Sequence, residues 1–190
     1  MRSIIIKKFA PSTWTPIEPD VKAQLVSLSS YCTEYMTLER QLKYDLPSIK
    51  KIQRVENPYL WGCYLLKKRE CQSRGQLGAV KEMKLYHATS QKFVLSIVST
   101  NLDWRRSFRN RFGQGVSFSP DASYANKYCN PHIGSDRALV VALVLVGKSH
   151  DGWYDTEMTR EGYDTSTGNC DKVYVKYYDH EFYPQYIVYY

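Results

Sequence analysis

The chain has 190 residues, of which 43% are hydrophobic, and it carries a formal net charge of +7. This length and composition predict one domain with a substantial core. No apolar run is long enough to span a membrane, and the apolar segment near the N-terminus is too short for a secretory signal. We therefore expect no membrane association and a cytoplasmic or nuclear location.

The cysteines exclude two common structural devices. They form an odd, scattered set with no C-x-x-C pair: Cys32, Cys63, Cys71, Cys129 and Cys170. Such a set provides neither a disulfide framework nor the ligand spacing of a zinc site. We expect reduced thiols and no metal.

The positive charge is concentrated in the first part of the chain. Residues 1–85 contain 15 lysines and arginines against 8 aspartates and glutamates, whereas residues 86–190 contain 11 of each kind. A basic surface attracts phosphate backbones, so nucleic-acid binding is one hypothesis. Apart from Lys67-Lys68-Arg69, however, the basic residues are dispersed, which is more typical of solvated helix faces. We therefore do not expect nucleic acid to be the main partner of this domain.

Hydrophobic periodicity predicts helices in the first half of the chain. Residues 1–19 contain three prolines and no periodicity, which indicates an extended lead-in. Apolar residues at a spacing of three to four predict an amphipathic helix over residues 20–44. Alternation then predicts a strand over residues 49–56, followed by a helix whose first turn contains Pro58.

The second half is dominated by strands. The expected elements are a short strand ending in a polar turn within 84–90, a helix capped by Ser90, a short strand within 112–119, a helix over 121–128 and strands over 137–146, 173–178 and 185–190. Because helices precede strands without βαβ alternation, the pattern predicts an α+β fold over residues 20–190.

Two local features are candidate site elements. His87 lies where a strand meets a helix, next to helix N-terminal amides that can hold an anion or a nucleotide. A structural hydrogen-bonding role is the alternative for such a histidine. Gly113 and Gly115 would let the backbone approach a ligand closely, with a plain turn as the alternative.

Several short motifs in a fixed order resemble the catalytic domain of the PARP family of ADP-ribosyltransferases. They are Ile52-Gln53-Arg54-Val55-Glu56-Asn57, Leu60-Trp61, Tyr86-His87-Ala88-Thr89-Ser90, Asn101-Leu102-Asp103-Trp104-Arg105, Phe112-Gly113-Gln114-Gly115, Asp121-Ala122-Ser123-Tyr124, Leu143-Val144-Leu145-Val146-Gly147 and Tyr183-Pro184-Gln185-Tyr186. The resemblance covers residues 20–190, which makes residues 1–19 a lead-in. It is greatest to the mono-ADP-ribosylating members that carry CCCH zinc fingers and WWE domains elsewhere.

This resemblance implies a fold of split antiparallel sheets flanked by helices, with a cleft for NAD as the substrate between them. At the position of His87 the family has a histidine that hydrogen-bonds an NAD ribose, and the next residue holds the nicotinamide amide through its backbone. At the position of Tyr128 it has a tyrosine that stacks on the nicotinamide ring. Thr89, Gly113 and Gly115 also match the family pattern at this site.

Four positions depart from that pattern. Ala88 replaces the glycine after the histidine, Ser117 replaces an aromatic wall of the pocket, and Ala125 replaces a serine that donates to the nicotinamide carboxamide. Val173 stands where the polymerising members have glutamate, so the resemblance implies transfer of single ADP-ribose units rather than chain growth. Loss of one aromatic contact and one hydrogen bond lowers affinity by about tenfold to a hundredfold.

Two functions therefore stay open. The first is NAD-dependent mono-ADP-ribosylation of a protein acceptor, with His87, Ser117 and Val173 at the positions of the family triad. The second is a catalytically inactive domain that keeps the fold for interaction with a protein partner. The sequence does not say which protein is the acceptor, or whether the chain is part of a longer protein.

Overall fold

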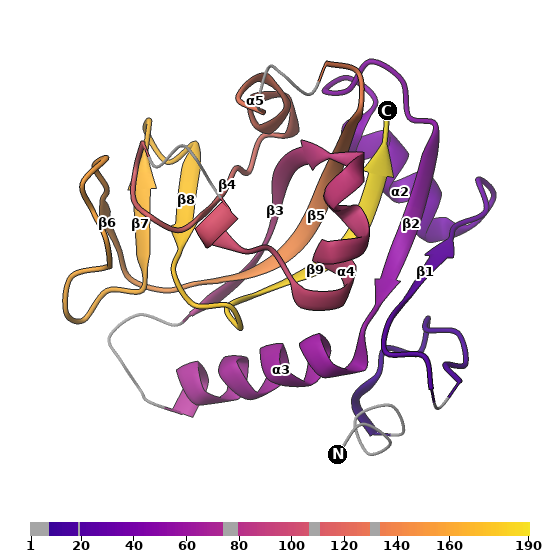
Figure 1. The fold of residues 1–190 in the computed structure, drawn as a ribbon, viewed down its shortest axis with the longest axis horizontal. Helices are drawn as coiled ribbons and strands as arrows, with labels where there is room; N and C mark the ends of the chain where they lie inside the picture. Colours follow the sequence, from indigo (N-terminus) through magenta and orange to yellow (C-terminus); the bar gives the residue numbers. More distant parts are fainter. Residues whose placement is uncertain (1–7, 19, 74–79, 107–110, 130–133) are drawn as a thin grey trace.

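Two β-sheets form the framework of the domain (Figure 1). The computed structural model describes residues 8–18, 20–73, 80–106, 111–129 and 134–190. The first sheet has the order β1 (Gln24–Ser27), β2 (Lys51–Glu56), β9 (Phe182–Tyr189), β5 (Arg137–Val146), β3 (Lys81–Ser90). The second has the order β4 (Val116–Phe118), β8 (Val173–Lys176), β7 (Thr165–Gly168), β6 (Ser149–Asp151). The strand pairs are antiparallel except for β6 and β7, which confirms the predicted α+β class of split antiparallel sheets.

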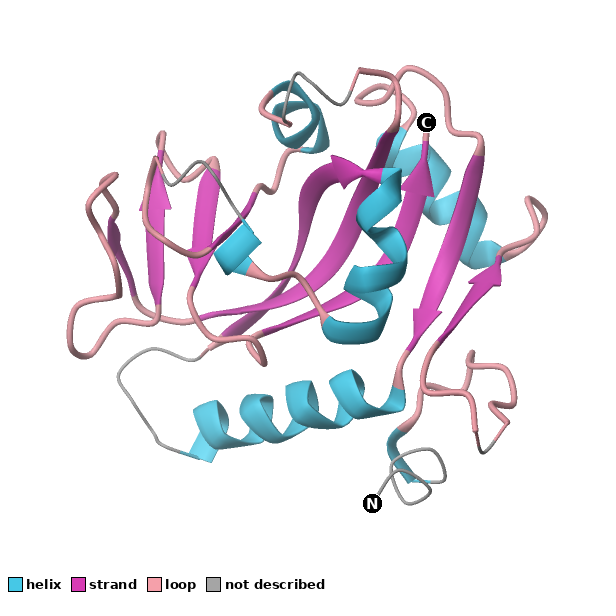
Figure 2. Cartoon of the chain, viewed as in Figure 1, coloured by secondary structure: helices cyan, strands magenta, loops and turns pink. Residues whose placement is uncertain are grey.

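Helices cover the larger sheet (Figure 2). They are α2 (Thr33–Leu42), α3 (Pro58–Ser73), α4 (Val94–Thr100) and α5 (Ala122–Lys127), with short 3₁₀ turns η1 (Gln91–Phe93) and η2 (Trp104–Arg106). Ser90 caps η1, because its side-chain oxygen accepts a hydrogen bond from the Lys92 amide. Within the described ranges, none of the helices combines the length and the apolar character needed to cross a bilayer.

The buried strand predicted over residues 137–146 is confirmed as β5, and it lies between β9 and β3. The predicted strand over 49–56 corresponds to β2, and the predicted helices at Pro58 and over 121–128 correspond to α3 and α5. These elements have strong periodic or capping signals, which explains why local sequence predicts them well.

The single helix expected over residues 20–44 is wrong. Its first part is strand β1, which pairs with β2 in the register Gln24↔Glu56 to Ser27↔Gln53. The helix begins only after Cys32, whose sulfur accepts a hydrogen bond from the Tyr35 amide. The exposed edge of β2 offers backbone partners that a periodicity argument does not include, so tertiary pairing overrides the helical spacing.

Strand β9 is longer than the predicted 185–190, because it starts at Phe182 and contains Pro184. Proline is tolerated here because the register against β5 shifts: Val141 faces Tyr186, but Ala142 faces Pro184. The extra residue forms a β-bulge where no ladder hydrogen bond is needed. Strands β6 and β7 were not predicted, since their short polar sequences carry no alternating pattern.

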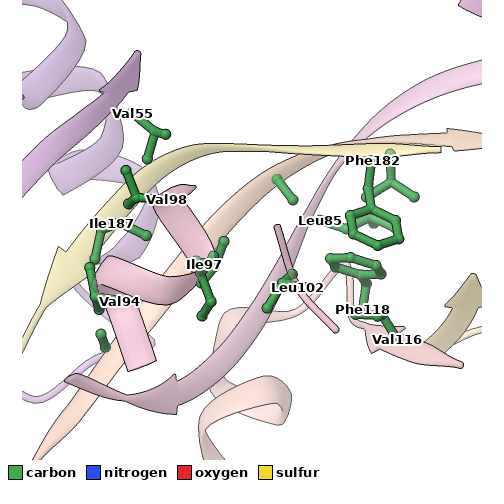
Figure 3. Packing of buried hydrophobic residues seen from close by; sticks show 14 of the residues in the cluster. Val55, Leu85, Val94, Ile97, Val98, Leu102, Val116, Phe118, Phe182 and Ile187 are labelled. Carbon is green, nitrogen blue, oxygen red and sulfur yellow. The ribbon is translucent and has the colours of Figure 1, made fainter. Parts of the chain in front are cut away.

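The main core lies between the first sheet, helix α4 and strand β4 (Figure 3). Val94, Ile97 and Val98 of α4 pack over the sheet beside Ile187. The rings of Phe118 and Phe182 face each other with centroids 5.2 Å apart, so β4 is anchored to the larger sheet by aromatic packing.

The described part of the lead-in is attached to this framework. The ring of Trp14 stacks on Tyr183 with centroids 6.5 Å apart. The Thr15 amide and hydroxyl donate to the Glu56 carboxylate, which is fully buried and also accepts from Gln24 and Arg54. These contacts satisfy a buried carboxylate that would otherwise be costly. The boundary between residues 19 and 20 stays a prediction.

Candidate functional site

A cleft of about 790 Å³ lies between β3, β4, β8 and helix α5. This volume is within the range of sites for small molecules and cofactors. Eight of the nine candidate residues line it: His87, Ala88, Thr89, Gly115, Ser117, Ala125, Tyr128 and Val173. The remaining candidate, Gly113, is not among the lining residues. The structure therefore brings together residues that are up to 86 positions apart in the sequence.

His87 lies on β3 and is held against β4. Its Nδ1 is 2.8 Å from the carbonyl oxygen of Ser117, and its ring meets Phe118 edge-on with centroids 6.1 Å apart. A carbonyl oxygen can only accept, so Nδ1 carries the proton. Burial lowers the pKa of His87, and the hydrogen bond to Ser117 opposes that effect only in part. The ring is therefore neutral at pH 7, with Nε2 available to accept a hydrogen bond.

The two alanine positions are parts of the core. The methyl groups of Ala88 and Ala125 pack against the cluster that includes Leu139, Val141 and Val188. Both residues are only partly buried, and both also line the cleft. Ala88 pairs with Leu139 in the ladder between β3 and β5, so its backbone position is fixed by the sheet.

The glycine pair serves the protein's own packing. A Cβ on Gly113 would lie 2.0 Å from the Tyr177 hydroxyl, and the φ of Gly113 is +132°. A Cβ on Gly115 would lie 2.4 Å from the Lys176 carbonyl oxygen. Both glycines therefore let the segment before β4 lie directly on β8. This finding favours the plain-turn alternative for Gly113, while Gly115 still lines the cleft.

Tyr128 and Val173 both line the cleft. Tyr128 follows α5 and is 50% exposed, so a flat face is available to a ligand. Val173 begins β8 and is buried, opposite Gly168 of β7. Among the described residues that line the cleft, the acidic ones are Asp103 and Asp136, and none is a glutamate.

Sequence reasoning missed the basic residues of the cleft, and it named Tyr124 only as an aromatic residue that could compensate for Ser117. The ring of Tyr124 lies against that of Tyr128, with centroids 4.4 Å apart at 35°. Lys92, Arg106 and Arg111 line the cleft as well. The sequence does indicate the contact between the two tyrosines. They are four residues apart, and residues at i and i+4 share a helix face.

The residues present fit a dinucleotide. They provide a half-exposed aromatic face, a neutral histidine with a vacant acceptor and three basic side chains that can face phosphates. Among the described residues, no group of three or more His, Cys, Asp or Glu side chains is arranged to hold a metal ion. The absence of a metal requirement stays a prediction.

Comparison with known proteins gives a family match. The family model described as the poly(ADP-ribose) polymerase catalytic domain matches residues 27–176. Protein mono-ADP-ribosyltransferase PARP11 of Mus musculus is 28% identical over 210 residues, which cover 94% of this chain and 63% of that protein. Protein mono-ADP-ribosyltransferase PARP12 of Homo sapiens is 29% identical over 202 residues, covering 96% of this chain and 28% of that protein. The chain thus spans less than two thirds of the length of these relatives.

Proposed function

This chain belongs to the family of poly(ADP-ribose) polymerase catalytic domains, and from that premise we propose that it binds NAD in the cleft and transfers a single ADP-ribose unit to a protein acceptor. The observation that carries the proposal is the pair formed by His87 and Val173 in one cleft. The histidine supplies a neutral acceptor for a ribose hydroxyl, and the valine supplies no carboxylate for chain elongation.

The contribution of each side chain follows from its position. Nε2 of His87 accepts a hydrogen bond from a ribose hydroxyl, because Nδ1 already donates to Ser117. The ring of Tyr128 stacks on the nicotinamide ring. The backbone amide and carbonyl of Ala88 hydrogen-bond the nicotinamide amide. Lys92, Arg106 and Arg111 neutralise the two phosphates.

When NAD is bound, the bond between the nicotinamide nitrogen and ribose C1′ breaks, nicotinamide keeps the electron pair, and an acceptor atom bonds C1′ and releases its proton. The cleft assists by orienting the ribose through His87 and by holding the departing ring against Tyr128. Since Val173 cannot take the proton, a base on the acceptor or a water molecule takes it.

A second candidate function is an inactive interaction module. Two observations favour it: Ala125 offers the cleft a methyl group that also packs against the core, and Ser117 lines the cleft without an aromatic ring. In this case a protein partner would recognise the fold while the cleft binds NAD weakly or not at all. A cytoplasmic or nuclear location is part of both proposals.

Calorimetric titration with NAD tests the proposed function. We expect saturable binding to the wild-type chain, a loss of at least tenfold in affinity for His87→Ala, and an unchanged affinity for His180→Ala, whose histidine is exposed. Mass spectrometry of an acceptor protein mixture should then show single ADP-ribose additions. A folded chain that shows no binding at millimolar NAD would exclude the transferase and favour the interaction module.

A further inference from the structure

The turn between β7 and β8 crosses to helix α5 at the end of the cleft that contains Tyr128. The Asn169 side-chain amide donates to the hydroxyl oxygen of Tyr124 over 3.0 Å. The ammonium group of Lys172 lies 5.9 Å from the centroid of the same ring. Figure 1 shows this turn and α5 at the same end of the molecule, although they belong to different layers.

The backbone of this turn is unusual. Asn169, Cys170 and Asp171 have φ values of 54°, 53° and 58°, and the Lys172 amide donates to the Asn169 carbonyl over 3.3 Å. Three consecutive residues other than glycine in the left-handed region cost free energy, which persists only where the surroundings fix the conformation. In this conformation the Asn169 side chain reaches Tyr124, which lines the cleft.

The contact joins the two halves of the domain. Helix α5 packs against β3 of the larger sheet, whereas Asn169 lies on the smaller sheet. Tyr124 is held at its hydroxyl by Asn169 while its face contacts Tyr128. Both tyrosines line the cleft, and so does Ser117, which contributes no aromatic ring.

We propose that Asn169 and Tyr124 form a clasp that positions the Tyr128 ring and fixes the width of the ring-binding end of the cleft. Tyr124 and Asn169 are positioning residues, since they act through Tyr128. The clasp compensates for Ser117 by holding an aromatic pair rigidly on one side of a flat ligand. This inference rests on the proposed function, because the flat ligand is the nicotinamide ring of NAD.

The test compares ligands with and without that ring. The probes are NAD, benzamide as a minimal ring ligand, and ADP-ribose, which lacks the ring. The variants are Tyr124→Phe, which removes the hydroxyl alone, and Asn169→Gly, which removes the amide and still accepts a positive φ. Asn169→Asp is the conservative rescue, because its carboxylate can accept a hydrogen bond from the Tyr124 hydroxyl. Tyr31→Phe, at a tyrosine that is 90% exposed, is the matched control.

Loss of one hydrogen bond corresponds to about threefold to tenfold in affinity. We expect Tyr124→Phe and Asn169→Gly each to show this loss for NAD and for benzamide, with no further loss in the double variant. Asn169→Asp should recover the affinity. The affinity for ADP-ribose should be unchanged within about twofold in every variant. Equal weakening of ADP-ribose and NAD, or unchanged benzamide affinity, would overturn the clasp. Benzamide binding that responds to the variants supports the clasp even if NAD is not turned over. A wild-type chain that binds neither NAD nor benzamide would overturn the proposed function and the clasp together.

Discussion

The Nδ1 atom of His87 and the carbonyl oxygen of Ser117 are 2.8 Å apart and connect β3 of the larger sheet to β4 of the smaller one. This bond fixes the tautomer of the ring. Ser117 has no aromatic side chain, but it still contributes to the site because its backbone carbonyl accepts this hydrogen bond.

The first prediction concerns pH. Burial lowers the pKa of His87 below its usual value of 6.5, so the unfolded chain binds this proton more tightly than the folded chain. The contribution of His87 to the free energy of unfolding is therefore complete above pH 6.5. It falls as the pH drops below 6.5, by at most about 1.4 kcal/mol per pH unit. Urea unfolding between pH 7 and pH 5 should show this loss, and His87→Gln should lose less stability over the same range. Identical pH profiles would contradict the assigned environment of the ring.

The second prediction concerns Gly113. In Gly113→Ala the new methyl group meets the Tyr177 hydroxyl at a backbone angle that alanine rarely adopts. We expect a loss of about 2–4 kcal/mol in the free energy of unfolding. Gly134→Ala is the matched control, because its φ is also positive but nothing lies within 4 Å of the new atom. It should lose only about 1 kcal/mol. Equal losses in both variants would show that the contact with Tyr177 contributes nothing.

The third prediction concerns the strained turn. Cys170 has a φ of 53° and is exposed, so Cys170→Gly relieves backbone strain without removing a buried contact. We expect a gain of about 0.5–1 kcal/mol. Cys170→Ala keeps the strain and should be within about 0.5 kcal/mol of the wild type. Thermal unfolding of the two variants under reducing conditions measures the difference, and a gain in both or in neither would argue against strain.

The fourth prediction concerns a buried ion cluster on β8. Lys176 is fully buried, and its ammonium donates to the carbonyl and carboxylate of Asp164 over 2.8 and 2.9 Å and lies 3.2 Å from Glu181. Burial alone would raise the pKa of Asp164, but Lys176 and the local hydrogen bonds hold it below its usual value. Burial raises the pKa of Glu181, and Lys176 opposes that shift.

Lys176→Met leaves two carboxylates without their cation, so we expect a loss of about 3–5 kcal/mol at pH 7. The deficit should shrink toward pH 4, because protonation neutralises the carboxylates of the variant, whereas in the wild type protonation of Glu181 removes its ion pair with Lys176. The double variant Lys176→Met/Glu181→Gln should recover part of the loss. A deficit that does not change with pH would mean that Lys176 acts only through packing.

The sequence was sufficient where a local signal was strong. Strand β5 and helix α3 follow from an apolar run and from a proline in a first turn. Helix α5 is predicted from Ser119-Pro120, but its N-cap is Asp121, whose side chain accepts a hydrogen bond from the Tyr124 amide. Strand β1 was not predictable from its own residues, because its only reason to be extended is the edge of β2. The clasp was not predictable either, since Asn169 and Tyr124 are 45 residues apart and nothing in either sequence segment indicates the other.

The candidate site shows the same division. Motif order identified residues that line one cleft, and this could be read without a structure. The contacts of Gly113 and Ala125 could not be predicted from the sequence. Gly113 lies against the Tyr177 hydroxyl and Ala125 against a core cluster, and both contacts arise from tertiary packing. Whether these residues bind NAD stays a prediction for the titrations described above.

Strand order has a consequence for how the domain is made. Strand β9, the last strand of the chain, lies between β2 and β5 in the middle of the larger sheet. During synthesis β2 and β5 therefore each lack one permanent neighbour until β9 has been made. Such long-range pairing is slow and leaves strand edges open in the nascent chain. Because β9 joins β2 to β5, loss of β9 should prevent folding rather than merely shorten the sheet.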